Sequence, residues 1–132
     1  MNSEEQNQFF DHAINKIKGI PGIDYIYVLN QDLILIREKK INGNDNHLEE
    51  ITTVLKSESL INKIATNSYS KPFHTYTFLN ENGLVVILKL QSSDTFYIVV
   101  IAGENEPVDL INLLKICKEA RFDFGKQLET KV

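Results

Sequence analysis

Residues 84–102 read LVVILKLQSSDTFYIVVIA, two nearly continuous apolar runs on either side of a short polar break. The runs cover residues 84–90 and 95–102, and neither alternates between apolar and polar side chains. A strand without alternation is covered on both faces, so both runs are expected inside a sheet. The break at residues 91–94, Gln-Ser-Ser-Asp, has turn composition. The stretch therefore predicts a hairpin of two central strands with further layers packed on both faces.

The segment after this hairpin has helical periodicity. Pro107 suits the first turn of a helix, and Asp109 suits the positive end of the helix dipole. The apolar residues that follow lie on one stripe and are Leu110, Leu113, Leu114, Cys117, Phe124 and Leu128. Cys117 is the only cysteine, which excludes an internal disulfide. Its place on the stripe predicts a core residue rather than a nucleophile or a metal ligand.

The first part of the chain predicts a helix followed by another hairpin. The helix is expected at residues 4–18, with acidic residues at its start and lysines near its end, as the dipole favours. Residues 23–29 and 33–37 are expected to be strands. Because their connection is so short, they must pair antiparallel. A polar loop is expected at residues 38–45.

A second helix is expected at residues 46–66. Its first apolar stripe is formed by Leu48, Ile51 and Leu55. A second, displaced stripe includes Val54 and Ile61, although Ser57-Glu58-Ser59 interrupts it. A helix with one buried face needs only one stripe. The pattern therefore indicates either a second partner surface on this helix or a kink at the interruption.

A third strand is expected at residues 73–79, directly after Pro72. The leading proline and the mixed polarity of this strand favour the edge of a sheet. Residues 80–83, Asn-Glu-Asn-Gly, predict the turn into the central pair. The elements thus follow the order α-β-β-α-β-β-β-α. We expect one α+β domain over residues 1–132.

The composition is that of an ordinary globular domain, with 42% hydrophobic and 24% charged residues among 132. A formal net charge of -4 argues against a nucleic-acid platform, which needs a basic footprint. No apolar run is long enough for a membrane span, and the polar N-terminus has no secretory signal character. We therefore expect a cytoplasmic protein with neither nucleic acid nor membrane as a partner.

Residue patterns that carry chemistry are missing from the sequence. His12, His47 and His74 are spread over three elements, without the spacing of a metal site. The glycines form no phosphate-binding pattern, and no serine stands in a nucleophile elbow. We therefore predict a protein that is not an enzyme and has no catalytic, cofactor-binding or metal-binding residues.

The predicted edge strand is long and uncharged, and such an edge must be covered or paired. Because the second helix comes just before it in the chain, we expect strand and helix together to form a twofold dimer interface. The predicted interface residues are Phe73, His74, Thr75, Tyr76, Thr77, Phe78, Val54 and Ile61. Proline in place of Tyr76 or Thr75 is expected to abolish the dimer.

The chain resembles the roadblock/dynein light chain family from about Gln8 to Leu128. The resemblance rests on Ile20-Pro21-Gly22-Ile23 leading into residues 25–30, on residues 83–88, on the strand 96–101, and on the three helices. It implies a five-stranded antiparallel sheet of order 2-1-5-4-3. The first and third helices would cover one face and the second helix the other.

The resemblance also implies a function. Family members are non-catalytic adaptors that dimerise with themselves or with a paralogous subunit and bind small Ras-like GTPases or larger scaffolds. Binding often occurs across the paired second helices, which makes Glu50, Ser57 and Glu58 the expected partner-binding residues.

Two other classes of protein compete with this interpretation. A profilin-like actin-binding module would need about seven strands, with residues 38–67 in strand rather than helix. A PAS-like or GAF-like sensor would need a roomy pocket in the concave face of the sheet. The dense apolar residues of the two central strands leave little space for one.

Overall fold

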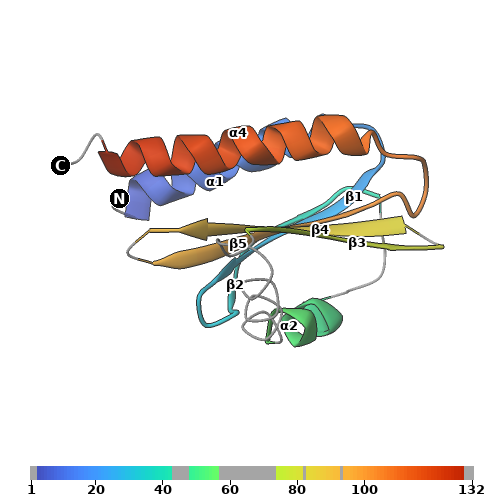
Figure 1. The fold of residues 1–132 in the computed structure, drawn as a ribbon, viewed down its shortest axis with the longest axis horizontal. Helices are drawn as coiled ribbons and strands as arrows, with labels where there is room; N and C mark the ends of the chain where they lie inside the picture. The colour runs from blue at the N-terminus through green and yellow to red at the C-terminus, as the bar shows by residue number, and fades with distance from the viewer. Residues whose placement is uncertain (1–2, 43–47, 57–73, 82, 93, 130–132) are drawn as a thin grey trace, which may run out of the picture.

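A five-stranded antiparallel sheet lies between two layers of helices (Figure 1). The computed structural model describes residues 3–42, 48–56, 74–81, 83–92 and 94–129. The elements in chain order are α1 (Ser3–Lys18), β1 (Ile23–Asn30), β2 (Leu35–Lys40), α2 (Leu48–Lys56), β3 (Thr75–Asn80), β4 (Gly83–Gln91), β5 (Thr95–Ala102) and α4 (Leu110–Glu129). The strand order is β2-β1-β5-β4-β3. With α1 and α4 on one face and α2 on the other, the expected α+β topology is confirmed.

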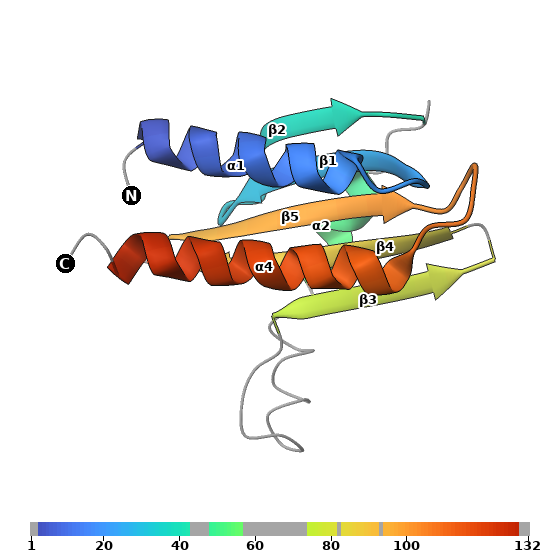
Figure 2. The same cartoon turned by 90° about the horizontal axis from the view of Figure 1, so that it is seen from above.

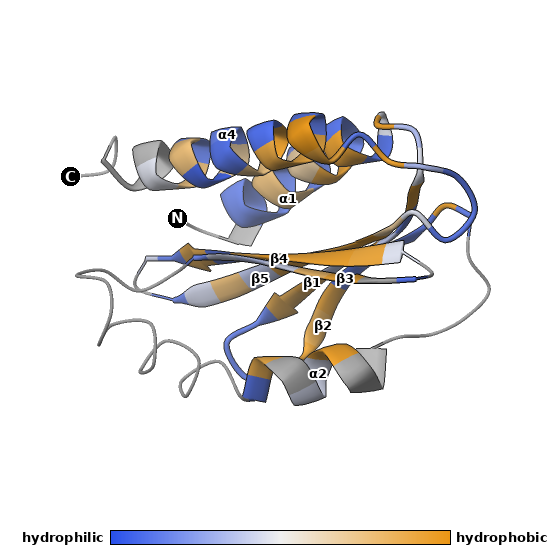
Figure 3. Cartoon of the chain, turned by 45° about the vertical axis from the view of Figure 1, so that its right-hand side comes forward, coloured by the Kyte–Doolittle hydropathy of each residue, from blue (hydrophilic) through white to orange (hydrophobic). Residues whose placement is uncertain are grey.

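The two apolar runs form the interior strands β4 and β5, as predicted. β5 lies between β1 and β4, and it pairs with both in antiparallel register. Ile98 and Val100 pack in the cluster beneath α1 and α4, whereas Val99 and Ile101 belong to the cluster on the α2 face. Figure 3 shows apolar colouring along most of β4 and over part of β5. Because both faces are buried, neither strand needs polar alternation.

Aromatic rings fill the larger of the two clusters. The rings of Phe10 and Phe96 lie 5.2 Å apart, and those of Phe9 and Phe124 also lie 5.2 Å apart. These contacts tie α1, β5 and α4 together, in the tilted and edge-on arrangements that aromatic pairs prefer. Cys117 is 1% exposed in the same cluster, so its prediction as a core residue is confirmed.

The bounds of β2 differ from the prediction. The strand runs from Leu35 to Lys40, not over residues 33–37, so part of the expected polar loop is strand. Leu33 has a φ of 64°, a left-handed backbone that cannot belong to a strand. The Asn30 side chain holds this turn open, because its Oδ1 accepts hydrogen bonds from the backbone N–H groups of Asp32 and Ile34. The turn is therefore longer than expected, and pairing with β1 carries the strand on to Lys40.

Three other element bounds bear on the predictions. α2 is described over Leu48–Lys56, with Ile51 and Leu55 buried against the sheet as the first stripe predicts. Most of the predicted second stripe lies outside the described residues. The β3 strand begins at Thr75 and ends at Asn80, and residue 73 of the predicted strand lies outside the described residues. α4 begins at Leu110, after Pro107, because the Asp109 carboxylate caps the helix by accepting a hydrogen bond from the Asn112 N–H at 3.1 Å.

The buried side chain and backbone of Asp24 connect β1 with the loop between β5 and α4 and with the residues that follow β2. Asp24 is fully buried at an irregularity in β1. Its carboxylate oxygens accept hydrogen bonds from the Glu104 backbone N–H at 2.9 Å and from Asn105 Nδ2 at 2.8 Å. Its backbone carbonyl accepts from the N–H groups of Ile41 and Asn42. Asp24 therefore anchors the loop between β5 and α4 to the end of β2, a role that the sequence alone did not indicate.

Candidate protein-protein interface

The two edges of the sheet differ in charge. At one edge, β2 carries Arg37-Glu38-Lys39-Lys40, and Glu38 to Lys40 are exposed. At the other edge, β3 has the sequence TYTFLN and carries no charged side chain. Charged side chains on an edge strand discourage pairing with another chain. The predicted position of β3 at an edge of the sheet is confirmed, and pairing of this edge with another chain stays a prediction.

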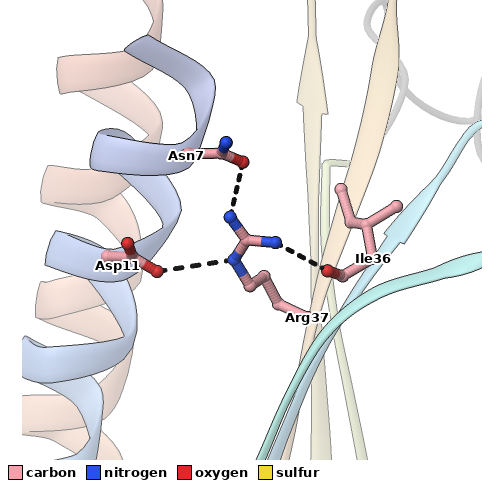
Figure 4. A network of polar contacts seen from close by, with 4 residues as sticks. All are labelled: Asn7, Asp11, Ile36 and Arg37. Carbon is pink, nitrogen blue, oxygen red and sulfur yellow. Dashed lines mark hydrogen bonds and ion pairs between the residues drawn. The ribbon is translucent and has the colours of Figure 1, made fainter. Parts of the chain in front are cut away.

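Arg37 also attaches the β2 edge to α1 (Figure 4). Its Nε donates a hydrogen bond to Asp11 Oδ1 at 3.4 Å, and a terminal guanidinium nitrogen donates to Asn7 Oδ1. Another terminal nitrogen donates to the Ile36 carbonyl at 2.9 Å. The side chain of Arg37 is thus engaged within the chain, which makes the β2 edge a poorer partner surface than β3.

The register of β3 defines which of its backbone groups face outward. β3 pairs with β4 alone in the described part of the chain. The Lys89 N–H donates to the His74 carbonyl at 2.8 Å, so the backbone of His74 is directed at β4. In an antiparallel ladder this direction alternates along the strand. Tyr76 and Phe78 therefore bond to β4, whereas Thr75, Thr77 and Leu79 direct their N–H and C=O groups to the open edge.

Apolar side chains remain exposed along this edge. Phe78 is 41% exposed and Leu79 is 69% exposed, and Thr77 is exposed as well. Tyr76, by contrast, is 8% exposed and packs in the cluster on the α2 face. Viewed from above, β3 lies outside the layer formed by α1 and α4 (Figure 2). Leu79 was not among the predicted interface residues, although it belongs to the same apolar strand.

The remaining predicted interface and partner-binding residues are described only in part. Phe73, Ser57, Glu58 and Ile61 lie outside the described residues. Val54 and Glu50 belong to α2, the helix that covers the face of the sheet that includes Tyr76. His74 is exposed and precedes β3, with its Nδ1 2.7 Å from the Thr75 hydroxyl oxygen.

A hollow of about 280 Å³ lies beside the start of β3. Three basic residues border it, namely His74 just before β3, Lys89 in β4 and Arg121 in α4, together with Phe122, Phe124 and other residues. Partial burial lowers the pKa of His74 below its ordinary 6.5, and the Arg121 guanidinium lowers it further. The sequence did not indicate this hollow, since residues 74, 89 and 121 are brought together only by the pairing of β3 with β4 and by the position of α4.

The described residues do not gather ligands for a metal ion. No group of three or more His, Cys, Asp or Glu side chains in the described ranges is arranged to hold one. Burial raises the pKa of the Cys117 thiol to about 11, which leaves it protonated at neutral pH. None of the helices in the described part of the chain combines the length and apolar composition needed to cross a bilayer.

Solved structures show which fold this is. The chain is similar to MglB from Myxococcus xanthus, with a TM-score of 0.70 and 12% identity over 98% of this chain and 99% of that one. It is also similar to an MglB described as having a tetrameric arrangement, with a TM-score of 0.75 and 10% identity over 100% and 96% of the two chains. A Roadblock/LC7 domain from Streptomyces avermitilis matches with a TM-score of 0.63 and 10% identity over 87% and 92%. The chain therefore has the roadblock fold.

Neither a scan against protein-family profiles nor a search of curated proteins finds a match. The likeness to known proteins thus lies in three-dimensional structure, at identities too low to carry more than the fold.

Proposed function

We propose that this protein is a roadblock-family adaptor that forms a dimer through β3 and α2 and performs no catalysis. The observation that carries the proposal is the open edge of β3, with outward backbone groups at Thr75, Thr77 and Leu79 and with Phe78 and Leu79 exposed beside them. Pairing two such edges would satisfy the backbone groups and cover the apolar side chains. The tetrameric arrangement described for one MglB supports self-association in a protein of this fold.

Proline at Thr77 tests the interface directly. Because the Thr77 N–H faces outward, Thr77→Pro removes a donor for the second chain while the bonds to β4 remain. Sedimentation of the wild-type chain should show a dimer, and Thr77→Pro should be a monomer with a largely unchanged helical spectrum. Thr77→Val is the matched control, because it keeps the N–H and the strand propensity. A Thr77→Pro protein that dimerises like the control would place the interface elsewhere.

Thr77→Pro is a better test of the interface than Tyr76→Pro, one of the two substitutions that the sequence suggested. Tyr76 directs its backbone toward β4 and buries its side chain under α2, so Tyr76→Pro would damage the monomer itself. Loss of a dimer in that variant would not distinguish an interface from unfolding. Thr75→Pro shares the outward geometry of Thr77→Pro and remains a valid second test.

We further propose a small Ras-like GTPase as the partner of the dimer, with Glu50, Ser57 and Glu58 as partner-binding residues. The proposal rests on the resemblance to roadblock adaptors. Tagged wild-type protein should retain a GTPase from its own cell extract in a manner that depends on whether GTP or GDP analogue is added. Glu50→Lys should reduce retention without changing the dimer. Retention of no GTPase with either nucleotide would contradict the proposed partner and leave the dimer untouched.

The profilin-like alternative is disfavoured by α2. That alternative requires strand across residues 38–67, whereas Leu48–Lys56 is helical. The sheet of the described residues has five strands, not about seven. Actin co-sedimentation is the direct measurement, and we expect none.

A further inference from the structure

The side of α4 that faces away from the sheet carries two large apolar side chains. Ile111 is 83% exposed and Phe122 is 69% exposed. The solvent side of a helix in a globular domain is normally polar, so two such residues on it are unusual. The exposed apolar residues of β3 belong to the proposed dimer interface, whereas Ile111 and Phe122 lie on a helix outside it.

These two residues belong to one straight stripe with two lysines between them. The buried side of α4 is formed by Leu113, Cys117, Ala120 and Phe124. The opposite side carries the outward stripe, whose four exposed members are Ile111, Lys115, Lys118 and Phe122. Because successive helical residues are about 100° apart, the spacing i, i+4, i+7, i+11 keeps the four directions within about 60°. From end to end the outward stripe is about 16 Å long, at about 1.5 Å per residue.

The outward stripe lies on the outer layer of the molecule. α4 runs beside α1 on the face of the sheet opposite α2, and β3 lies outside this layer (Figures 1 and 2). Lys115 and Lys118 give the centre of the stripe two positive charges. Exposed Glu119 and Arg121 follow on its two flanks, and their charges offset each other. The stripe is therefore apolar at its ends and cationic in its middle.

A second copy of this chain is a poor occupant of the outward stripe. The pair of lysines lies at the midpoint between Ile111 and Phe122. A twofold contact between two such stripes, parallel or antiparallel, would therefore place lysines against lysines. Like charges that face each other across an interface disfavour the contact. The charge pattern instead complements a partner that is acidic in its middle and apolar at its ends.

A lipid surface fits the outward stripe less well than a single helix does. α1 lies beside α4 in the same layer and exposes Glu4 and Asp11. A flat anionic bilayer that met α4 would also meet these carboxylates and be repelled by them. A helix is only about 10 Å wide, so it can lie along α4 without covering α1.

We infer that the outward stripe binds an acidic amphipathic helix of another protein. Apolar side chains at the two ends of that helical segment contact Ile111 and Phe122. Carboxylates between them pair with Lys115 and Lys118. The surface is separate from β3 and α2, so it does not depend on the proposed dimer.

Two synthetic peptides test this inference. Each is an alanine-rich helix of about 18 residues, which is long enough to hold helical structure in water. Both carry leucine at the ends of an i, i+4, i+7, i+11 stripe, with either glutamate or lysine at the two positions between. Fluorescence anisotropy of the labelled peptides measures their dissociation constants for wild-type protein. The glutamate peptide should bind at least about tenfold more tightly at about 50 mM NaCl, because each carboxylate faces a lysine.

Substitutions on α4 should change this binding in a defined way. Phe122→Ala should weaken binding of the glutamate peptide by about tenfold, because it removes apolar contact area. Lys115→Glu combined with Lys118→Glu should reverse the preference, so that the lysine peptide binds more tightly. The matched control is Lys39→Glu combined with Lys40→Glu, which changes the net charge equally on the exposed end of β2 and should bind like wild type. Circular dichroism checks the folding of each variant.

Several results would overturn the inference. Equal binding of the two peptides by wild type, or no binding of either up to about 1 mM, would do so. A double lysine variant that keeps the wild-type preference would do so as well. Co-sedimentation with phosphatidylserine–phosphatidylcholine vesicles that is lost in Phe122→Ala would assign the stripe to a lipid surface instead. Thr77→Pro should bind the glutamate peptide like wild type, so failure of the proposed dimer would leave this surface intact.

Discussion

Asp24 shows how much of this fold depends on single polar side chains. Its carboxylate is fully buried and accepts two hydrogen bonds from the loop between β5 and α4. A buried charge is tolerated only when such donors satisfy it. The same loop is held by Gly22, whose N–H donates to Glu106 Oε1 at 3.0 Å. These contacts fix the point at which the chain leaves the sheet and enters α4.

Replacing Asp24 is expected to destabilise the protein markedly. Asp24→Ala leaves the Glu104 N–H and the Asn105 amide without their acceptor, at a cost of about 2–4 kcal/mol in the free energy of unfolding. Asp24→Asn keeps one acceptor oxygen and should lose less. Urea unfolding followed by circular dichroism measures both variants. Equal stability of Asp24→Ala and wild type would show that this loop does not depend on the carboxylate.

The lone thiol is expected to be inert in the folded protein. Cys117 is 1% exposed and its pKa is raised to about 11, so at pH 8 little of it is thiolate. Labelling by a disulfide reagent should be slow in buffer and immediate in denaturant. Labelling in buffer should become faster as the pH rises toward 11. Rapid labelling at neutral pH would mean that α4 separates readily from the sheet.

At the scale of the element, the same residue type has opposite roles at two positions. Gly22 has a φ of 92°, and a Cβ there would lie 2.6 Å from the Pro107 carbonyl oxygen. Gly125 is helical, and a Cβ there meets no heavy atom within 4 Å. Glycine is therefore required by the turn into β1, whereas in α4 it only lowers the stability of the helix.

Alanine at these two positions should move stability in opposite directions. Gly125→Ala should raise the free energy of unfolding by about 0.5–1 kcal/mol, because alanine favours the helix. Gly22→Ala should lower it, since the backbone is left-handed and the Cβ clashes with the β5–α4 loop. Thermal unfolding of the two variants beside wild type provides the measurement. Destabilisation by Gly125→Ala would indicate that this part of α4 is packed more tightly than the structure shows.

The predictions from sequence succeeded or failed element by element for identifiable reasons. The runs at residues 84–90 and 95–102 indicated β4 and β5, because a strand that is buried on both faces has apolar residues at nearly every position. The bounds of β2 were missed because Leu33 adopts a left-handed backbone that its residue type disfavours. The charged residues Glu38 to Lys40 were assigned to a loop, because the exposed end of an edge strand has no pattern of apolar residues that would identify it as a strand.

At the scale of the whole molecule, the two edges of the sheet differ in charge, and in the described part of the chain each edge strand pairs with one neighbour. β2 is charged and attached to α1 through Arg37, whereas β3 is uncharged and bears Phe78 and Leu79. This asymmetry is what a twofold assembly through one edge requires, because the opposite edge must not continue the sheet.

Thermal stability should therefore depend on protein concentration. Because only the folded chain can form the proposed dimer, a hundredfold increase in protein concentration should raise Tm by about 3–5 °C. Thr77→Pro should show no such dependence. Scanning calorimetry or circular dichroism at matched concentrations compares the two proteins. A wild-type Tm that does not change with concentration would contradict a dimer coupled to folding.

The sequence by itself determined the order of the elements among the described residues, the interior position of β4 and β5, and the edge position of β3. These properties follow from which side chains are buried, and the spacing of apolar and polar residues along the chain indicates this directly. Tertiary structure decided which backbone groups of β3 face outward, because their direction depends on the register with β4. It also decided that His74, Lys89 and Arg121 share one hollow, since that meeting requires strand pairing and helix packing between residues far apart in the chain.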